Sequence, residues 1–347
     1  MKKFLIAALA TTALTTAAQA GSLSLDMRAD YNSTTYKDTP GASDQTKFYF
    51  KTGRLDYQGK ALEDLSFRVR LAFNKDATRG VDSSQTAVEY AYLTHKMSDM
   101  FSLSVGKFNT EFGGFEGATS GADLYLTSPF YTPTGESTTL LGTKDLLYMT
   151  GVKGTFSFEG QQIHVLATNE PDSTAKAGPS ASQNSSMWGV TWRGAFLEKA
   201  LNFNLSYHTL AGPTKDDKHQ FIAAGVMWNS SPVMASVDYL NGEFKADATG
   251  FKDSEVSIVG KLAYTGFEQW TPRLEVISTE EKIGGATDLT NKYMSYGVVA
   301  EYKPYADTNF RYHFAYNNTT ADLDGVADKA VKDEVVVGAR LLADFLK

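Results

Sequence analysis

Polar and apolar residues alternate with a period of two along much of this chain. Between Leu65 and Asn74 every odd position is apolar, whereas most even positions are polar or charged. Successive side chains of a β-strand point to opposite faces, so this segment predicts a strand with one apolar and one polar face. The same alternation recurs in residues 22–31, 201–208, 310–317 and 335–345.

Sixteen segments can be placed in this way. They cover residues 22–31, 46–58, 62–74, 85–95, 99–109, 145–156, 161–169, 185–195, 201–210, 219–229, 233–244, 253–265, 269–279, 291–303, 307–317 and 333–345. Most have about ten residues or more, the length with which a tilted strand crosses a bilayer, whereas strands of soluble proteins average about five or six. Aromatic residues occupy both parities in 46–58 and 219–229, so the register of these two segments stays open.

The connections between the segments alternate in length. Those after even-numbered segments are short and include 59–61, 96–98, 157–160, 196–200, 230–232, 266–268 and 304–306. Those after odd-numbered segments are longer and cover 32–45, 75–84, 110–144, 170–184, 211–218, 245–252, 280–290 and 318–332. Short periplasmic turns and long external loops are typical of outer-membrane barrels. This order places both ends of the barrel sequence on the periplasmic side.

Outward-facing aromatic residues agree with this orientation, because such residues gather at both membrane interfaces. The external ring is predicted to contain Phe73, Tyr207, Tyr239 and Tyr316. The periplasmic ring is predicted to contain Tyr57, Tyr92, Tyr264, Tyr302 and Phe345.

A sheet that spans a membrane must close on itself, since hydrocarbon offers no partner to an open edge. Sixteen strands leave a water-filled lumen, whereas eight are filled by side chains. The predicted fold is therefore all-β, a 16-stranded antiparallel transmembrane β-barrel formed by residues 21–347.

The first twenty residues have the features of an export signal. Lys2 and Lys3 precede an apolar stretch, and Ala18-Gln19-Ala20 is a typical cleavage motif, so we expect cleavage after Ala20. A short membrane anchor is the alternative, but this stretch is too short to span about 30 Å of hydrocarbon. A cleaved signal, together with the barrel, predicts an integral protein of the bacterial outer membrane.

Composition excludes several other classes. The chain has no cysteine, which excludes disulfide scaffolds, Cys-ligated metals and thiol catalysis. Removing Lys2 and Lys3 takes the formal charge from −7 to −9, and an acidic balance argues against nucleic-acid binding. We predict no metal and no cofactor.

Residues 110–144 form a connection far longer than its neighbours, and it contains Phe112, Phe115, Phe130 and Tyr131. Long loops in compact folds tend to be functional or disordered, and disordered loops carry fewer apolar groups. We therefore expect this third external loop to fold into the lumen and constrict it. An ordered loop that caps the barrel from outside is the alternative.

Charged residues predict an electrostatic filter at this constriction. Acidic residues of the loop are expected to face arginines of the first three strands across a narrow aqueous gap and to create a transverse field. The acidic side contains Glu111, Glu116 and Asp123, and the basic side contains Arg28, Arg54, Arg68 and Arg70. Local salt bridges that only hold the loop in place are the alternative.

Other bases are expected to face the lumen from the remaining strands. They are Lys153, Arg193, Lys261, Arg273, Lys303, Arg311 and Arg340. The acidic residues expected to face the lumen are about as numerous as these bases, so the sign of the net charge of the whole lumen stays open.

The segments Gly53–Asp76 and Val88–Glu116 resemble the phosphate-selective porin O/P family. They contain a G-R-L…G-K…F-x-x-R strand pair and a V-G-x-F-x-T-x-F-G-like segment that enters the third loop. The resemblance implies a sixteen-stranded trimeric channel whose lumen is lined with basic residues for anions such as phosphate. Arg54, Arg68, Arg70 and Lys107 lie within the matching segments.

The predicted function is passive diffusion of small hydrophilic solutes and ions through an outer-membrane porin. The expected partners are two further copies in a homotrimer, outer-membrane lipid and lipopolysaccharide. A non-conducting surface barrel, either an adhesin or a structural protein, is the alternative. An outer-membrane hydrolase is disfavoured because none of the five histidines lies in a recognised catalytic motif.

Overall fold

The computed structural model describes residues 21–39, 41–74, 87–132, 140–169, 186–211, 217–246, 249–284 and 288–346. The predicted signal peptide, residues 1–20, lies outside the described residues, as do residues 133–139 of the long third loop. No helix in the described ranges is long and apolar enough to cross a membrane.

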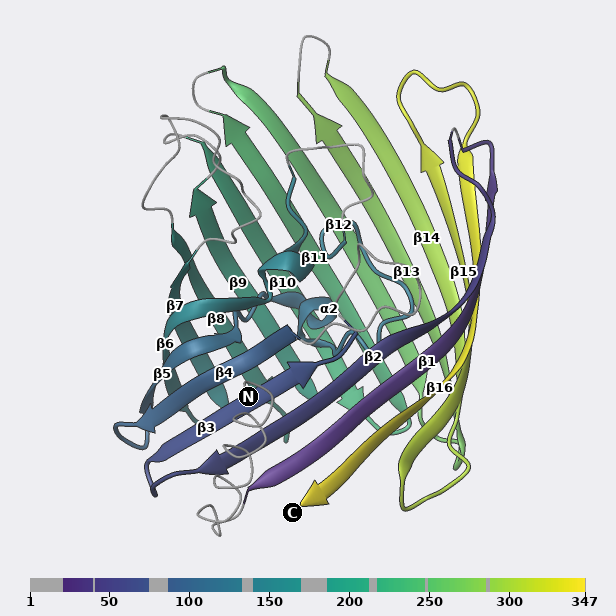
Figure 1. Cartoon of the computed structure of the whole chain (residues 1–347). Coiled ribbons are helices and arrows are strands. Elements are labelled where there is room, and N and C mark those ends of the chain that lie inside the picture. Colours follow the sequence, from purple (N-terminus) through teal and green to yellow (C-terminus); the bar gives the residue numbers. More distant parts are fainter. Residues whose placement is uncertain are drawn as a thin grey trace, which may run out of the picture.

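All sixteen predicted strands are present, and they form one closed antiparallel barrel in which each strand pairs with its neighbours in sequence (Figure 1). The barrel closes where β1 pairs with β16, with Met27 opposite Leu341. The strands are β1 (Ser22–Lys37), β2 (Gln45–Lys60), β3 (Leu65–Ala72), β4 (Ala87–Lys96), β5 (Phe101–Asn109), β6 (Tyr148–Phe158), β7 (Gln161–Asn169), β8 (Ser186–Phe196), β9 (Leu201–Ala211), β10 (Lys218–Ser230), β11 (Val233–Ala246), β12 (Phe251–Tyr264), β13 (Trp270–Ile283), β14 (Leu289–Tyr302), β15 (Asn309–Asp322) and β16 (Ala330–Leu346).

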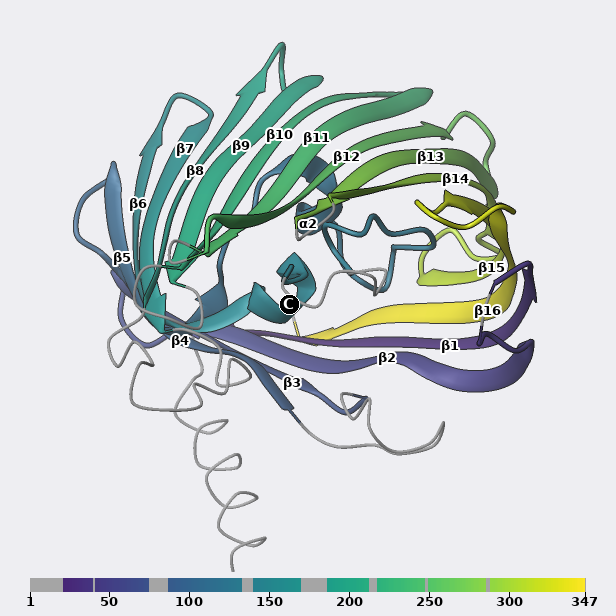
Figure 2. The same cartoon turned by 90° about the horizontal axis from the view of Figure 1, so that it is seen from above.

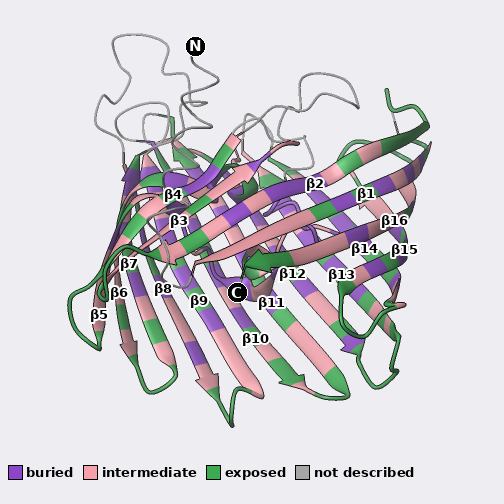
Figure 3. Cartoon of the chain, turned by 60° about the horizontal axis from the view of Figure 1, so that its bottom comes forward, coloured by how far each residue is buried: buried purple, intermediate pink, exposed green. Residues whose placement is uncertain are grey.

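Several strands continue beyond their predicted ends at the long-loop end of the barrel. β1 extends to Lys37 and β15 to Asp322, because cross-strand pairing continues through residues that sequence alternation had left to the loops. Parts of the predicted long loops therefore belong to strands. Some of the remaining connections at this end are only as long as the turns at the short-turn end of the barrel. Figure 3 shows buried, intermediate and exposed residues alternating along the strands of the wall.

A β-bulge explains the ambiguous parity of β2 but not that of β10. The register between β1 and β2 shifts where Arg28 pairs with Thr52 and Ala29 with Phe50, so parity changes around Lys51. Tyr49 therefore shares a face with Arg54, while Phe48 is 73% exposed on the outside. In β10 there is no such shift: Phe221 faces inward and is buried, and Ile222 faces outward.

The outward assignment of Tyr92 is wrong for the same reason. The β3–β4 register shifts between Arg70 and Leu71, which leaves Glu89 as the additional residue of β4. Tyr92 consequently pairs with the inward-facing Arg68 and packs edge-on against Phe108, which is fully buried. A bulge inserts one residue and so exchanges the faces of everything beyond it.

Candidate functional site

The described parts of the connection between β5 and β6, residues 110–132 and 140–147, run inside the barrel (Figure 2). It contains the short helix α2 (Gly114–Ala118) and the 3-10 helix η1 (Thr143–Leu146). Interior side chains of distant strands hold its backbone. Asn204 of β9 donates to the Gly114 carbonyl at 2.7 Å, and Asn317 of β15 donates to the Tyr125 carbonyl at 2.9 Å. The described part of the loop thus lies along the inner face of β9–β15.

Asp238 of β11 fixes the tightest turn of the loop. Its carboxylate accepts hydrogen bonds from the backbone amides of Phe115 and Glu116, each at 2.8 Å. Gly114 has a positive φ of 73°, a conformation that glycine adopts without steric cost. Its Cα also passes close to Gly225 of β10, where a Cβ would come within 3.0 Å of it. Glycine at both positions therefore lets the loop lie directly on the wall.

Apolar side chains of the loop are buried against apolar residues that point into the lumen. Phe112 and Phe130 both contact the ring of Phe221 edge-on, at centroid distances of 5.5 and 6.0 Å. Leu240 belongs to the same buried cluster. Burying one such side chain contributes about 1.5–3 kcal/mol, so this cluster accounts for both the apolar content of the loop and the inward aromatic of β10.

Glu111 pairs with bases other than those predicted. Its carboxylate lies 2.7 Å from Nζ of Lys153 on β6 and 2.6 Å from Nη2 of Arg193 on β8. Burial alone would raise the pKa of Glu111, but the two cations outweigh burial and lower the pKa to about 2. Glu111 therefore anchors the start of the loop to the β6–β8 wall, far in sequence from the arginines of β2 and β3.

Glu116 faces the interior of its own loop. Its carboxylate accepts hydrogen bonds from the backbone amide of Ser128, at 2.8 Å, and from the Ser128 hydroxyl. The residue is 1% exposed, and burial raises the pKa of its carboxyl. The prediction that Glu116 forms part of the acidic side of the filter is not supported by this geometry, because the loop itself encloses the carboxylate.

Asp123 is the one predicted loop acid that lines the open space next to the arginines of β2 and β3. It pairs with Arg311 of β15 and lies 2.5 Å from Nη1 of Arg340 of β16. Burial would raise the pKa of Asp123, but the two arginines hold it below its usual value. Arg340 is shared with Asp26 of β1 at 2.7 Å.

Arg28 supports the loop next to Asp123 rather than facing an acid of the loop. Its guanidinium donates to the carbonyls of Ala122 and Leu124, at 2.8 and 3.3 Å, and pairs with Asp30 at 2.9 Å. The ring of Tyr125 lies 4.3 Å from the guanidinium carbon. Arg28 is 2% exposed, so it stabilises the loop and has little access to a passing solute.

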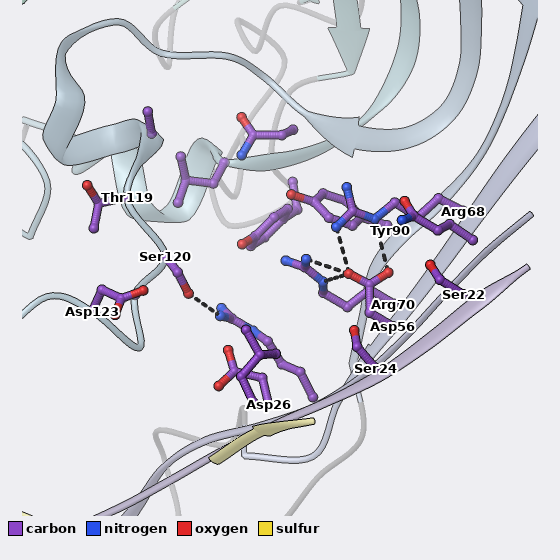
Figure 4. A pocket seen from close by; sticks show the side chains of 18 of the residues that line it. Ser22, Ser24, Asp26, Asp56, Arg68, Arg70, Tyr90, Thr119, Ser120 and Asp123 are labelled. Carbon is purple, nitrogen blue, oxygen red and sulfur yellow. Dashed lines mark hydrogen bonds and ion pairs between the residues drawn. The ribbon is translucent and has the colours of Figure 1, made fainter. Parts of the chain in front are cut away.

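Arg68 and Arg70 of β3 form a half-buried basic part of the wall (Figure 4). Both bind the carboxylate of Asp56 on β2, with shortest distances of 2.6 and 2.5 Å. Both guanidinium carbons lie over the ring of Tyr90, at 4.5 and 4.4 Å from its centroid. Arg54 pairs with Glu89 at 2.8 Å and donates to Ser120 of the loop at 3.2 Å. These contacts hold the three arginines in fixed positions.

An opening of about 550 Å³ lies between this wall and the loop. On the wall it is lined by Arg54, Asp56, Arg68, Arg70 and Tyr90 and by Asp26, Arg340 and Asp344 of β1 and β16; on the loop it is lined by residues 117–121, Asp123 and Tyr131. The loop side thus consists mainly of small and hydroxyl-bearing residues. The sequence predicted that three loop acids face four arginines. Of these seven residues, Asp123, Arg54, Arg68 and Arg70 line the same opening.

Comparison with known proteins bears on the same part of the chain. Residues 22–168 match the model of the family described as phosphate-selective porin O and P. The family resemblance seen in the sequence is confirmed over these residues. No curated protein matches the chain.

Solved structures of outer-membrane proteins have the same fold. An anion-selective porin from Comamonas acidovorans superposes with a TM-score of 0.66 at 12% identity, covering 93% of this chain and 100% of that one. The outer-membrane channel DcaP of Acinetobacter baumannii gives 0.64 at 14% identity, covering 93% and 97%. The trimer form of OmpT, an outer-membrane protein of Vibrio cholerae, gives 0.63 at 14% identity, covering 94% and 100%.

The other predicted lumen bases lie elsewhere on the barrel wall. Lys153 and Arg193 pair with Glu111, and Arg273 lies 2.7 Å from Glu301. Lys261 shares the parity of the inward-facing Glu255 on β12. Lys303 follows the end of β14 and is exposed in the turn, so its assignment to the lumen is wrong.

Sequence reasoning did not assign roles to Tyr90, Ser120 and Asp238. Tyr90 faces inward only because of the bulge at Glu89, which alternation did not reveal. Asp238 was recognisable as an inward acid, but its partners are backbone amides of the loop, which carry no sequence signal.

Proposed function

We propose that the protein is an outer-membrane porin, a water-filled channel for passive diffusion of small hydrophilic solutes and ions. The observation that carries this proposal is the closed sixteen-stranded barrel with an opening of about 550 Å³ between a charged wall and an in-folded loop. The loop, residues 110–144, is then the constriction. Charged residues that line such an opening act on a solute at the place where it has least room to avoid them.

Anions are the preferred ions in this proposal. The side chains of Arg68 and Arg70 are 28% and 19% exposed, whereas the carboxylate-bearing side chain of Asp56, which neutralises one of them, is 10% exposed. Glu89, the partner of Arg54, is 2% exposed. At the β2–β3 wall a passing ion therefore meets the guanidinium groups more readily than the carboxylates of Asp56 and Glu89, whereas Asp26, Asp123 and Asp344 line other sides of the same opening. Arginine suits phosphate, because its planar fork of donors matches the oxyanion.

Conductance in a planar bilayer tests the proposal. We expect purified protein to give discrete conductance steps in KCl and a zero-current potential of the sign for anion preference across a salt gradient. Folded barrels that insert without conducting would contradict the proposal and favour a surface barrel with an adhesive or structural role. The same preparation, assayed with ester and peptide substrates, separates both from a hydrolase.

The proposal includes removal of residues 1–20 on export, contact with outer-membrane lipid and lipopolysaccharide, and assembly as a homotrimer. Support for the trimer comes from the family resemblance and from the similar fold of OmpT, which is described in a trimer form. Light scattering of the unheated protein in detergent should give three chains per particle. A monodisperse monomer that still conducts would contradict the trimer without affecting the channel.

A further inference from the structure

Five lysines lie on the outer surface of the barrel, near the long-loop ends of five consecutive strands. They are Lys218, Lys245, Lys252, Lys282 and Lys292, one on each strand from β10 to β14. Each has the same parity as the exposed apolar residues of its strand, for example Lys245 with Tyr239 and Lys292 with Met294. They therefore point away from the lumen. Figure 1 shows that these strands stand side by side in one wall.

Three of these lysines lie directly opposite one another. Lys245 pairs in register with Lys218 on one side and with Lys252 on the other. Like charges in directly opposed positions destabilise a sheet. Glu243 compensates in part, because its carboxylate lies 2.6 Å from Nζ of both Lys245 and Lys252.

The compensation along the row is incomplete. Lys282 pairs with Glu280 at 3.0 Å, so two outward carboxylates accompany five lysines on these strands. Lys292 lies in register with Glu280 on one side and with Asp322 of β15 on the other, so the surplus of positive charge is concentrated on Lys218, Lys245 and Lys252, where an anionic partner would remove the repulsion.

The row follows the upper edge of the apolar surface. The last outward apolar residues before the lysines are Ile222, Tyr239, Val256, Val276 and Met294. Each lysine lies two to six positions from that apolar residue toward the long-loop end, which is about 5–14 Å for a strand that rises about 3.3 Å per residue and is tilted by about 45°. Phosphate groups of membrane lipids lie at this height, just beyond the hydrocarbon.

The opposite ends of the same strands differ. Their outward positions carry Trp228, Val233, Tyr264, Trp270 and Tyr302, and within the described β10–β14 no outward lysine lies at that end. The charge is therefore confined to the level of one leaflet, the one next to the long loops.

We propose that this lysine row binds the phosphate groups of a phosphorylated glycolipid in the outer leaflet of the membrane. The ammonium groups bind phosphate as point charges, while the apolar residues below them contact the acyl chains. The inference rests on the proposed outer-membrane location but does not depend on conduction.

The test measures binding of purified bisphosphorylated lipid A to the folded full-length barrel in micelles of a neutral detergent. The variant is Lys245→Gln, Lys252→Gln and Lys282→Gln combined. The matched control is Lys60→Gln, Lys199→Gln and Lys303→Gln, which removes three exposed lysines at or next to the short-turn end. Native mass spectrometry counts bound lipid, and a titration gives the dissociation constant for each protein.

We expect the triple variant to bind lipid A at least tenfold more weakly than wild type, because each lysine near an anionic headgroup contributes about fivefold in affinity. The control should match wild type, and lipid A stripped of both phosphates should bind all three proteins equally weakly. Equal dissociation constants for wild type and the triple variant would overturn the inference. So would undiminished binding of the dephosphorylated lipid.

Two further measurements keep the outcomes separate. Lys245→Gln alone, which also relieves the repulsion with its neighbours, serves if the triple variant does not fold, and it should weaken binding about fivefold. Bilayer conductance is recorded on the same preparations. A barrel that binds lipid A through these lysines but does not conduct would refute the channel and leave the lipid site standing.

Discussion

Removing the two half-buried arginines of β3 should reverse the local charge that a passing ion meets at the β2–β3 wall. With Asp56, Arg68 and Arg70 carry a combined charge of one positive unit at the edge of the opening. The double variant Arg68→Ser and Arg70→Ser leaves Asp56 alone and makes this site one negative unit. The charge at the wall thus changes by two units without a change in the loop.

The size of the effect follows from Coulomb's law with screening. An ion about 5 Å from a unit charge in water has an interaction energy of about 0.8 kcal/mol, and a Debye length of about 8 Å reduces this to about 0.4 kcal/mol. Two units shift the energies of an anion and a cation by about 0.9 kcal/mol in opposite directions, which changes their permeability ratio about 20-fold. Low-dielectric walls increase this value.

The assay is the zero-current potential across a tenfold KCl gradient, which should move toward cation preference by tens of millivolts. Adding Asp56→Asn removes the carboxylate left without partners and reduces the net change to one unit, so the ratio should change about fourfold to fivefold. Lys96→Ser with Lys199→Ser has the same net charge change as the double variant, but at the short-turn end, and serves as the control. If the double variant and wild type give the same potential and both are folded, the filter lies elsewhere.

Three other changes test the loop. Deleting residues 117–134 should raise single-channel conductance, since this segment lines the opening; unchanged conductance in a folded barrel would mean that the loop does not set the pore size. Asp238→Ala removes the acceptor of two buried amides and should destabilise the loop by about 1–3 kcal/mol per amide. We expect faster proteolysis and noisier conductance, with Asp238→Asn intermediate between wild type and Asp238→Ala. Identical proteolysis of wild type and both variants would contradict the role of Asp238 as an anchor of the loop. The loop acids should not shift selectivity between about pH 7 and pH 4, because the pKa of Glu111 is about 2, that of Asp123 is lowered, and Glu116 is enclosed. A lowered carboxyl pKa stabilises the folded loop above the unfolded value of about 4.3, and this contribution is lost as the pH falls toward about 2, so anchoring by Glu111 should weaken only in strong acid.

Local pattern was sufficient to predict the strands and the barrel. A strand that faces lipid on one side and water on the other must alternate, and a membrane-spanning sheet must close, so both properties are written into consecutive residues. The inward direction of Arg54, Arg68 and Arg70 followed from the same alternation. The apolar content of residues 110–144 similarly predicted a loop that is packed rather than solvated.

Only the tertiary structure decided which charges meet. Glu111 pairs with Lys153 and Arg193 because the loop leaves β5 along the β6–β8 wall, and Asp123 reaches Arg311 and Arg340 only after the loop has crossed the barrel. These partners are 42 to 217 positions away in sequence, and no local pattern encodes such a distance.

The sequence also could not predict which face of the sheet the residues beyond a β-bulge occupy. One additional residue at Glu89 turns Tyr90 and Tyr92 inward, and a similar shift around Lys51 reorients the start of β2. A bulge depends on how two strands pair, and pairing is a property of the closed sheet. The sequence therefore determined the wall and its polar face, whereas the closed barrel determined which of those polar groups line the opening.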